Sequence, residues 1–247
     1  MRGRIRFGLF VALLLLAASG FANAACVDPT QLLHSTVSIT RHFDDRELHA
    51  HPGVVGVRGT GWFLSPTTIV TAEHVSTAMT LSAQDWKPIE VANGDTSQLI
   101  AARILRLAGA EPEKLAIIEL QSGVADAHAV TIRREPLAPE EQVITIAFPK
   151  GRPRVVGGRF VRIGDDGKVA GMALLELYEG ENRLIIDHGA SGAPVLDCSG
   201  RVAAVVSNVF TQSIHWAYRE IRISTAWGMP NVVSVPLHAL NDFYQTN

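Results

Sequence analysis

The hydrophobic positions of this chain fall in short runs that polar and turn-forming residues interrupt. The runs are rich in Val, Ile and Thr, and they end at Gly, Pro, Asn or Asp. This pattern is typical of β-strands. We predict strands within the segments STVSIT, VVGVRGTGWFLSP, TTIVTAEHV, LAIIEL, QVITIAFP, GGRFVRIG, RVAAVVSNVF and NVVSVPL.

Helical periodicity is scarce in the same chain. A brief helix is expected after His74, and the spacing of Leu237, Leu240 and Phe243 predicts a short C-terminal helix. Many strands separated by turn signals favour an all-β barrel or sandwich. The stretch 121–142 has the most linker-like composition, because it combines prolines with consecutive charged residues. We therefore expect two strand-rich halves, 25–125 and 126–247.

The N-terminal segment has the order of a secretory signal peptide. Arginines near the start are followed by the apolar run 7–18 and by the small-residue site Ala-Asn-Ala at 22–24. The apolar run is short for a membrane span, so we expect cleavage of residues 1–24 and no stable membrane insertion afterwards. Asn23 stands where a lipoprotein signal carries an aliphatic residue, which favours a soluble protein in the periplasm or outside the cell.

The overall charge narrows the range of partners. The 247 residues include 22 Lys and Arg against 24 Asp and Glu, a formal net charge of -2. A protein with this charge balance is not expected to have the basic surface that nucleic-acid binding needs. The two cysteines, Cys26 and Cys198, would meet an oxidising compartment, where pairing is favoured over two free thiols. Such a bridge would contribute roughly 5 kcal/mol in the chain-entropy model.

The segment DHGASGAP places Ser191 among small residues. Gly189 tolerates a positive φ, so this loop is able to turn sharply and present the N–H groups of Gly189 and Ser191 to one oxygen. Hydrolysis of an amide also needs a base, and His74 stands at the end of a predicted strand. The alternative is an ordinary turn serine together with a core histidine.

The segments GTGWFLSP…IVTAEHV and GASGAPVLDCSGRVAAVVS resemble the trypsin-like (chymotrypsin-fold) serine proteases, and most closely the bacterial HtrA/Deg-type peptidase domain. AFPKG and NVVSVPLHAL extend the resemblance in the right order over about 35–243. It implies two six-stranded antiparallel β-barrels with a short C-terminal helix and an active site in the cleft between them. His74 would come from the first barrel and Ser191 from the second, with Gly189 and Ser191 forming the oxyanion hole. We expect no PDZ module.

The acid of the expected triad departs from the family pattern. An aspartate usually opens a strand of pattern D-[IL]-A-[LV]-[LI], whereas KLAIIEL places Lys114 there. A lysine cannot accept the hydrogen bond that orients the histidine. Either a neighbouring acid replaces the aspartate, with Glu113 the first candidate and Glu111 the second, or the site works poorly or not at all.

Further site residues follow from the same resemblance. Ile185 falls at the floor of the primary pocket, and an apolar floor favours small or apolar side chains at the cleaved position. His188 lines this pocket or contacts substrate, unless it is an exposed loop histidine. Ser207 lies in VVSNV, which resembles the strand that pairs with extended substrate. Ala190 would strain the nucleophile loop, the segment around Ser191 within DHGASGAP, if the φ of Ala190 were positive.

These observations predict an exported serine endopeptidase that cleaves polypeptides through a Ser-His acyl-enzyme mechanism. It requires no metal or organic cofactor, and its oligomeric state stays open. The histidines and acidic residues of 42–51 lack a fixed ligand spacing, so we expect a solvated hairpin loop there. The alternative function, favoured by Lys114, is a catalytically weak or silent fold that binds peptides or proteins in the cell envelope.

Overall fold

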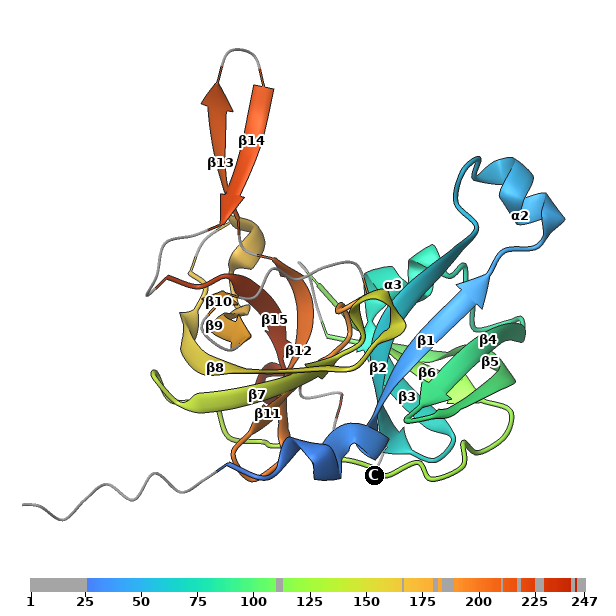
Figure 1. Ribbon diagram of the computed structural model, residues 1–247, viewed down its shortest axis with the longest axis horizontal. Helices are drawn as coiled ribbons and strands as arrows, with labels where there is room; N and C mark the ends of the chain where they lie inside the picture. The colour runs from blue at the N-terminus through green and yellow to red at the C-terminus, as the bar shows by residue number, and fades with distance from the viewer. Residues whose placement is uncertain are drawn as a thin grey trace, which may run out of the picture.

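The computed structural model describes residues 26–109, 113–165, 167–179, 182–183, 189–209, 211–216, 219–224, 229–240 and 243. The predicted signal peptide, Glu111, Ile185 and His188 lie outside these residues. The strands form two antiparallel barrels that lie side by side (Figure 1). The predicted all-β class with two six-stranded barrels is confirmed.

The first barrel closes in the strand order β1-β2-β3-β6-β5-β4. Alternate residues of its strands point inward, as the pleat of a strand requires. Val37, Ile39, Phe63, Ile69 and Ile118 are among the fully buried side chains of its core. Its strands are β1 (Thr36–His42), β2 (Gly56–Ser65), β3 (Thr68–Ala72), β4 (Lys87–Asn93), β5 (Thr96–Ala108) and β6 (Leu115–Leu120).

The second barrel closes because β8 and β9 pair with each other at the ends of the sheet order β9-β15-β12-β11-β7-β8. A short strand, β10 (Asn182–Arg183), is added beside β9. Val143, Val156, Leu175 and Val195 belong to the core of this barrel. Its strands are β7 (Gln142–Ala147), β8 (Arg154–Ile163), β9 (Ala173–Glu179), β11 (Pro194–Asp197), β12 (Val202–Val209) and β15 (Val232–Pro236).

A third apolar cluster joins the two barrels. Trp62 and Ile117 of the first barrel belong to the same buried cluster as Val205 and Val233 of the second. The predicted C-terminal helix is a 3-10 helix, η4 (Leu237–Ala239), and Phe243 beyond it is also buried in this cluster. The outward faces of the facing strands therefore form a packed interface rather than a solvated gap.

Five further 3-10 and α elements, of which α2 is described below, and one hairpin complete the described chain. The hairpin β13 (Thr211–Trp216) and β14 (Arg219–Ser224) projects from the second barrel (Figure 1). The other elements are η1 (Pro29–Ser35), α3 (Glu73–Ala78), η2 (Pro149–Gly151) and η3 (Gly167–Val169). Among the described residues, no helix has the length and apolarity needed to cross a membrane.

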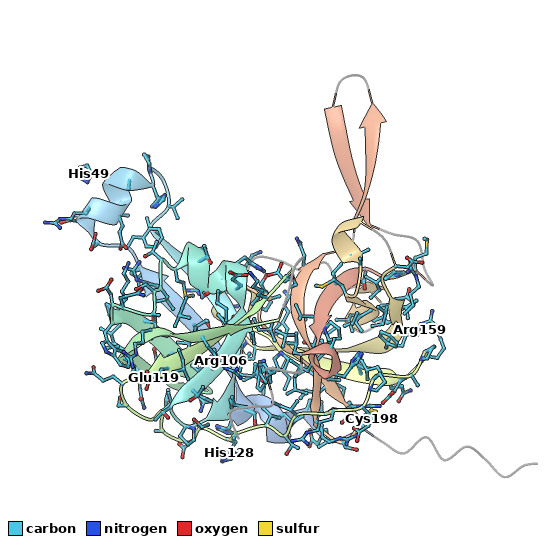
Figure 2. The ribbon with its side chains drawn as sticks, turned by 180° about the vertical axis from the view of Figure 1, so that it is seen from behind. His49, Arg106, Glu119, His128, Arg159 and Cys198 are labelled. Atoms are coloured by element: carbon cyan, nitrogen blue, oxygen red, sulfur yellow. A yellow bond between two sulfur atoms is a disulfide. The ribbon has the colours of Figure 1, made fainter. Side chains whose placement is uncertain are left out.

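The solvated connection expected between the paired strands β1 and β2 is present, and it contains a short helix that the sequence did not predict, α2 (Asp45–Ala50). Asp44 accepts hydrogen bonds from the N–H groups of Arg46 and Glu47, and the Glu47 carboxylate accepts one from the Asp44 N–H. This capping box satisfies the first turn of the helix. Figure 2 shows His49 on this projection, far from Arg159 of the second barrel.

Glu47 also anchors α2 to the first barrel. Its carboxylate accepts hydrogen bonds from Arg41 Nη2 at 2.8 Å and from Thr80 Oγ1 at 3.0 Å. Burial raises the pKa of Glu47, but these hydrogen bonds outweigh burial and lower the pKa to about 2. The folded state therefore gains stability from ionised Glu47 above about pH 4.5, and loses it as the pH falls from there towards about 2.

Glu47→Gln is expected to lower the free energy of unfolding by about 1 to 2 kcal/mol at pH 7, since it removes charge-assisted hydrogen bonds. The difference from the unsubstituted protein should shrink as Glu47 becomes protonated at acid pH. Urea unfolding at pH 7, 5 and 3 measures it, with the exposed Glu135→Gln as the control. A difference that stays constant across these pH values would contradict this assignment.

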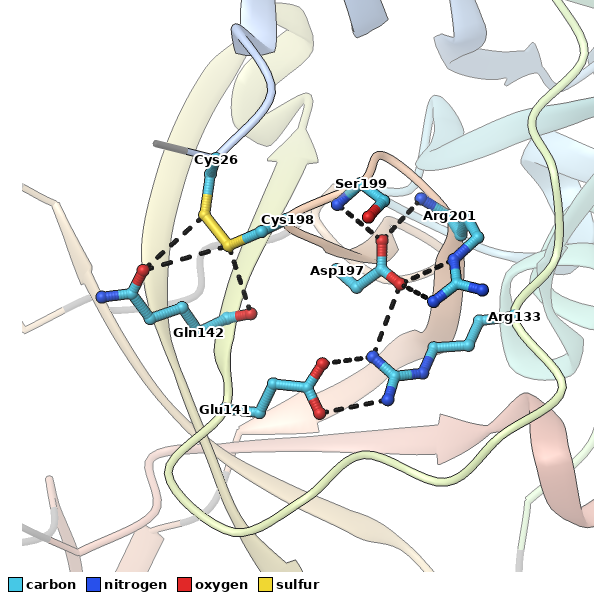
Figure 3. Close-up of a disulfide and its surroundings, with 8 residues drawn as sticks. All are labelled: Cys26, Arg133, Glu141, Gln142, Asp197, Cys198, Ser199 and Arg201. Carbon is cyan, nitrogen blue, oxygen red and sulfur yellow. Dashed lines mark hydrogen bonds and ion pairs between the residues drawn. A yellow bond between two sulfur atoms is a disulfide. The ribbon is translucent and has the colours of Figure 1, made fainter. Parts of the chain in front are cut away.

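The N-terminal arm is held against the second barrel by a disulfide between Cys26 and Cys198 (Figure 3). The Val27 N–H also donates to the carbonyl oxygen of Cys198 at 3.0 Å. Because Cys198 follows β11, which begins three residues after Ser191, the arm braces the strand that leaves the nucleophile loop.

The linker-like stretch between the barrels is anchored beside this disulfide. Arg133, 11% exposed, pairs with Glu141 and lies 3.4 Å from Asp197 Oδ2 (Figure 3). Asp197 also accepts hydrogen bonds from the Ser199 N–H and from Arg201. Burial raises the pKa of Glu141, but the hydrogen bond from Arg133 outweighs it and holds this pKa below its usual value. The segment is therefore an ordered strap between the barrels.

Candidate active site

His74 lies in α3, at the point where the chain leaves β3. The backbone N–H of Glu73 donates to the carbonyl oxygen of Lys114 at 3.0 Å, and Ala72 pairs with Leu115 in the sheet. These contacts fix the start of α3 beside the start of β6. His74 Nδ1 lies 3.1 Å from Glu113 Oε1 as a result.

This pair has the chemistry that a histidine base requires. A carboxylate at Nδ1 holds a proton on that nitrogen and leaves Nε2 as the proton acceptor. The acid comes from the residue before Lys114, so Lys114 contributes its backbone carbonyl to the frame while Glu113 supplies the carboxylate. The side chains of His74 and Glu113 are 46% and 22% exposed, so the pair lies near the surface rather than deep in the core.

The nucleophile loop turns at two glycines, Gly189 with a φ of 104° and Gly192 with a φ of 90°. Ala190 and Ala193 are absent from the positive-φ residues of the described chain, so their side chains cause no strain of that kind. Within the described chain, the N–H groups of Gly189 and Ser191 have no hydrogen-bond acceptor. They are therefore free to stabilise a negatively charged oxygen.

The loop is attached to β12 by backbone hydrogen bonds. The Gly192 N–H donates to Val206 O, and the Val206 N–H donates to Ala193 O, both at 2.8 Å. Ser191 Oγ donates to the carbonyl oxygen of Ser207 at 3.1 Å. Over the described residues no hydrogen bond joins Ser191 to His74. Hydrogen bonds of this kind often tighten only when substrate binds.

Backbone contacts between the barrels bring Ser191 close to the part of the first barrel that carries His74. The Thr60 N–H of β2 donates to Ser191 O at 2.9 Å. A Cβ at Gly192 would lie only 2.1 Å from Thr71 Oγ1 of β3, three residues before His74. The nucleophile loop of the second barrel therefore presses against the strands that deliver the histidine. Sequence reasoning overlooked Thr60, because a polar residue between two glycines gives no sign of its contact with the second barrel.

The remaining predicted site residues are placed as follows. Ser207 lies in β12 and is buried, with its carbonyl oxygen facing Ser191 Oγ. Ile185 and His188, the predicted pocket residues, lie outside the described residues, as does the alternative acid Glu111. In the part of the chain that the structure describes, no group of three or more His, Cys, Asp or Glu side chains is arranged to hold a metal ion.

Two antiparallel barrels with a serine loop and a histidine-bearing helix at their interface define the trypsin-like serine protease fold. The sequence profile of the trypsin-like peptidase domain matches residues 59–205, more than half of the chain, and the chain belongs to this family. The resemblance expected from the sequence is confirmed. A search of curated proteins found no significant match.

Solved structures share this fold at low sequence identity. An inactive serine-to-alanine variant of Rv3671c from Mycobacterium tuberculosis H37Rv is 16% identical, with a TM-score of 0.54 and coverage of 84% of this chain and 83% of the other. The active form of the Rv3671c protease is 17% identical, with a TM-score of 0.54 and coverage of 84% and 77%. At this identity the likeness concerns the fold.

Proposed function

We propose that the chain is a serine endopeptidase in which Ser191 is the nucleophile, His74 the general base and Glu113 the orienting acid. The observation that carries this proposal is the distance of 3.1 Å between Glu113 Oε1 and His74 Nδ1. The expected aspartate is absent, yet a carboxylate reaches the nitrogen at which an acid is required. A binding module has no need of such a carboxylate.

The proposed reaction uses the groups in two half-reactions. His74 Nε2 takes the proton of Ser191 Oγ while Oγ attacks the peptide carbonyl carbon, and the N–H groups of Gly189 and Ser191 stabilise the oxyanion. His74 then donates the proton to the leaving amine, and the C–N bond breaks. A water molecule, deprotonated by His74, attacks the resulting ester and releases the acid product and Ser191. Substrate binding must first turn Ser191 Oγ away from the Ser207 carbonyl.

The substrate is an extended polypeptide with a small or apolar residue before the cleaved bond. The apolar Ile185 at the expected pocket floor supports this preference, since it offers no carboxylate to a basic side chain. Export to the periplasm or the exterior belongs to the same proposal. The signal-like pattern of 1–24 supports it, and a disulfide between Cys26 and Cys198 is stable in such a compartment.

A catalytically silent binding protein is the second candidate. The observation that favours it is the hydrogen bond from Ser191 Oγ to the Ser207 carbonyl, which directs the hydroxyl proton to an acceptor other than His74. The two candidates differ in the reactivity of Ser191 towards an electrophile, because only a base-activated serine reacts rapidly.

Labelling with a fluorophosphonate probe, read by intact mass, separates these candidates. The protein without residues 1–24 is expected to gain one adduct, while Ser191→Ala and His74→Ala gain none in the same time. The reaction is followed from about pH 6 to about pH 9. Absence of an adduct throughout would overturn the proposed function and favour the binding protein.

A further inference from the structure

Thr60 of β2 is the only described residue of the first barrel that bonds the backbone of the nucleophile loop through both its main chain and its side chain. Its N–H donates to Ser191 O at 2.9 Å, and its hydroxyl donates to Gly189 O at 2.6 Å. Thr60 is fully buried, so water does not compete for these bonds. The two carbonyl groups belong to the same residues whose N–H groups face the proposed oxyanion.

The Thr60 hydroxyl is able to donate its proton to only one of its two neighbours. The Phe148 N–H approaches Thr60 Oγ1 at 3.0 Å and is able only to donate, so the hydroxyl accepts there. Its single proton is then left for Gly189 O, which is able only to accept. A serine or threonine at this position completes both bonds, whereas an apolar side chain completes neither.

The position of Thr60 itself is fixed within the first barrel. Its carbonyl oxygen accepts a hydrogen bond from Thr71 Oγ1 at 2.7 Å. The glycines on either side allow close packing, because a Cβ at Gly59 or Gly61 would lie 2.4 Å from Val75 Cγ1 or Ile69 Cγ2. Thr60 is therefore a buried residue that is held firmly in place, and it is able to support the loop that packs against it.

The start of the loop needs such a support because a glycine restrains its own backbone poorly. Gly189 has a φ of 104° and no Cβ, so rotation of the peptide unit between Gly189 and Ala190 meets little steric resistance. A change in that unit would move the N–H of Ser191 relative to the N–H of Gly189. Catalysis requires both donors to be aimed in advance at the developing oxyanion.

We propose that Thr60 is a positioning residue of the oxyanion hole, which holds the 189–191 backbone in its donor geometry from the opposite barrel. This inference rests on the proposed function and extends it to a residue that touches no reacting atom. It predicts that the Thr60 hydroxyl contributes to the rate of the chemical step and leaves substrate binding nearly unchanged.

Steady-state kinetics on a peptide ester or amide test this proposal with Thr60→Val, which keeps the shape of the side chain and removes the hydroxyl. The value of kcat is expected to fall by about 10- to 100-fold, somewhat less than after loss of an oxyanion donor itself, while KM stays within about threefold. Thr60→Ser should restore kcat to within about threefold. Thr60→Ala, which differs from Thr60→Ser only by the hydroxyl, gives the same comparison if Thr60→Val folds poorly.

Thr145→Val is the matched control. Thr145 is also buried and donates its hydroxyl to a backbone carbonyl, Pro194 O at 2.8 Å, but it makes no bond to 189–191. Both valine variants should lose similar thermal stability, and only Thr60→Val should lose kcat. An equal loss of kcat in the two variants, or none in Thr60→Val, would overturn the proposal.

Amide hydrogen exchange, followed by mass spectrometry on peptides that cover 189–193, gives a readout that needs no activity. These amides should exchange faster in Thr60→Val than in Thr145→Val or Thr60→Ser. If the unsubstituted protein takes no fluorophosphonate and cleaves nothing, the proposed function fails, while the exchange rates still decide whether Thr60 holds the loop. Equal exchange in all variants would show that it does not.

Discussion

Replacing Glu113 by glutamine is expected to lower kcat/KM for a peptide substrate by about 10²- to 10⁴-fold. The glutamine amide is able to donate to Nδ1 of His74, which would place the ring proton on Nε2 and remove the acceptor that the proposed mechanism needs for the Ser191 proton. The upper figure applies to a buried acid. The loss of about 10²-fold applies if the acid constrains the histidine ring more weakly, as we expect here because His74 and Glu113 are 46% and 22% exposed. Progress curves at saturating and limiting substrate measure the effect.

Glu119→Gln is the matched control for this prediction. Glu119 lies on β6, which begins two residues after Glu113, but it pairs with Arg103 at 2.7 Å rather than with the histidine. Its kcat/KM should stay within about twofold of that of the unsubstituted protein. Equal effects of the two substitutions would remove Glu113 from the proposed mechanism.

The sequence left this acid open between Glu113 and Glu111 for a physical reason. Which side chain reaches His74 depends on where α3 starts relative to β6. That relation is set by the hydrogen bond from the Glu73 N–H to Lys114 O and by the pairing of Ala72 with Leu115. Contacts between segments some forty residues apart leave no periodic trace in either segment. The pattern therefore leaves the acid open, and the proposal of Glu113 rests on a three-dimensional contact with His74.

The fold was more accessible to sequence reasoning, because most strands of both barrels carry runs of β-branched residues. Two long strands of the first barrel, β4 and β5, were not predicted. In β5 the register shifts between Ile104 and Arg106, and such an irregularity breaks the alternation of apolar and polar residues. Arg103 of the same strand lies over the Trp86 ring at 4.6 Å, so a charged residue covers apolar surface there.

Thr60 is an example of a residue whose role no local pattern reveals. Its hydroxyl bonds a carbonyl 129 positions further along the chain. The sequence showed a threonine between two glycines, which is compatible with any tight strand crossing. Thr60 contacts the nucleophile loop only because the second barrel packs against the first.

Gly192→Ala is expected to disrupt the same contact by adding a single methyl group. The added Cβ would lie 2.0 Å from Thr60 O and 2.1 Å from Thr71 Oγ1, distances that no folded protein tolerates. The φ of 90° at Gly192 would add backbone strain for a residue with a side chain. Overpacking and strain together should lower the free energy of unfolding by about 3 to 5 kcal/mol. Urea unfolding at neutral pH measures this loss.

The peptidase rate of the folded Gly192→Ala molecules should also fall. The barrels or the nucleophile loop must move to admit the methyl group, and Ser191 is the adjacent residue. Gly171→Ala separates strain from steric overlap, since Gly171 has a φ of 76° and a Cβ there would meet nothing within 4 Å. That variant should lose only about 1 to 2 kcal/mol and keep its peptidase rate. If both variants lost the same stability, backbone strain alone would account for Gly192. A folded Gly192→Ala protein with a normal rate would instead mean that the close approach of Thr60, Thr71 and the serine loop is not required for the chemistry.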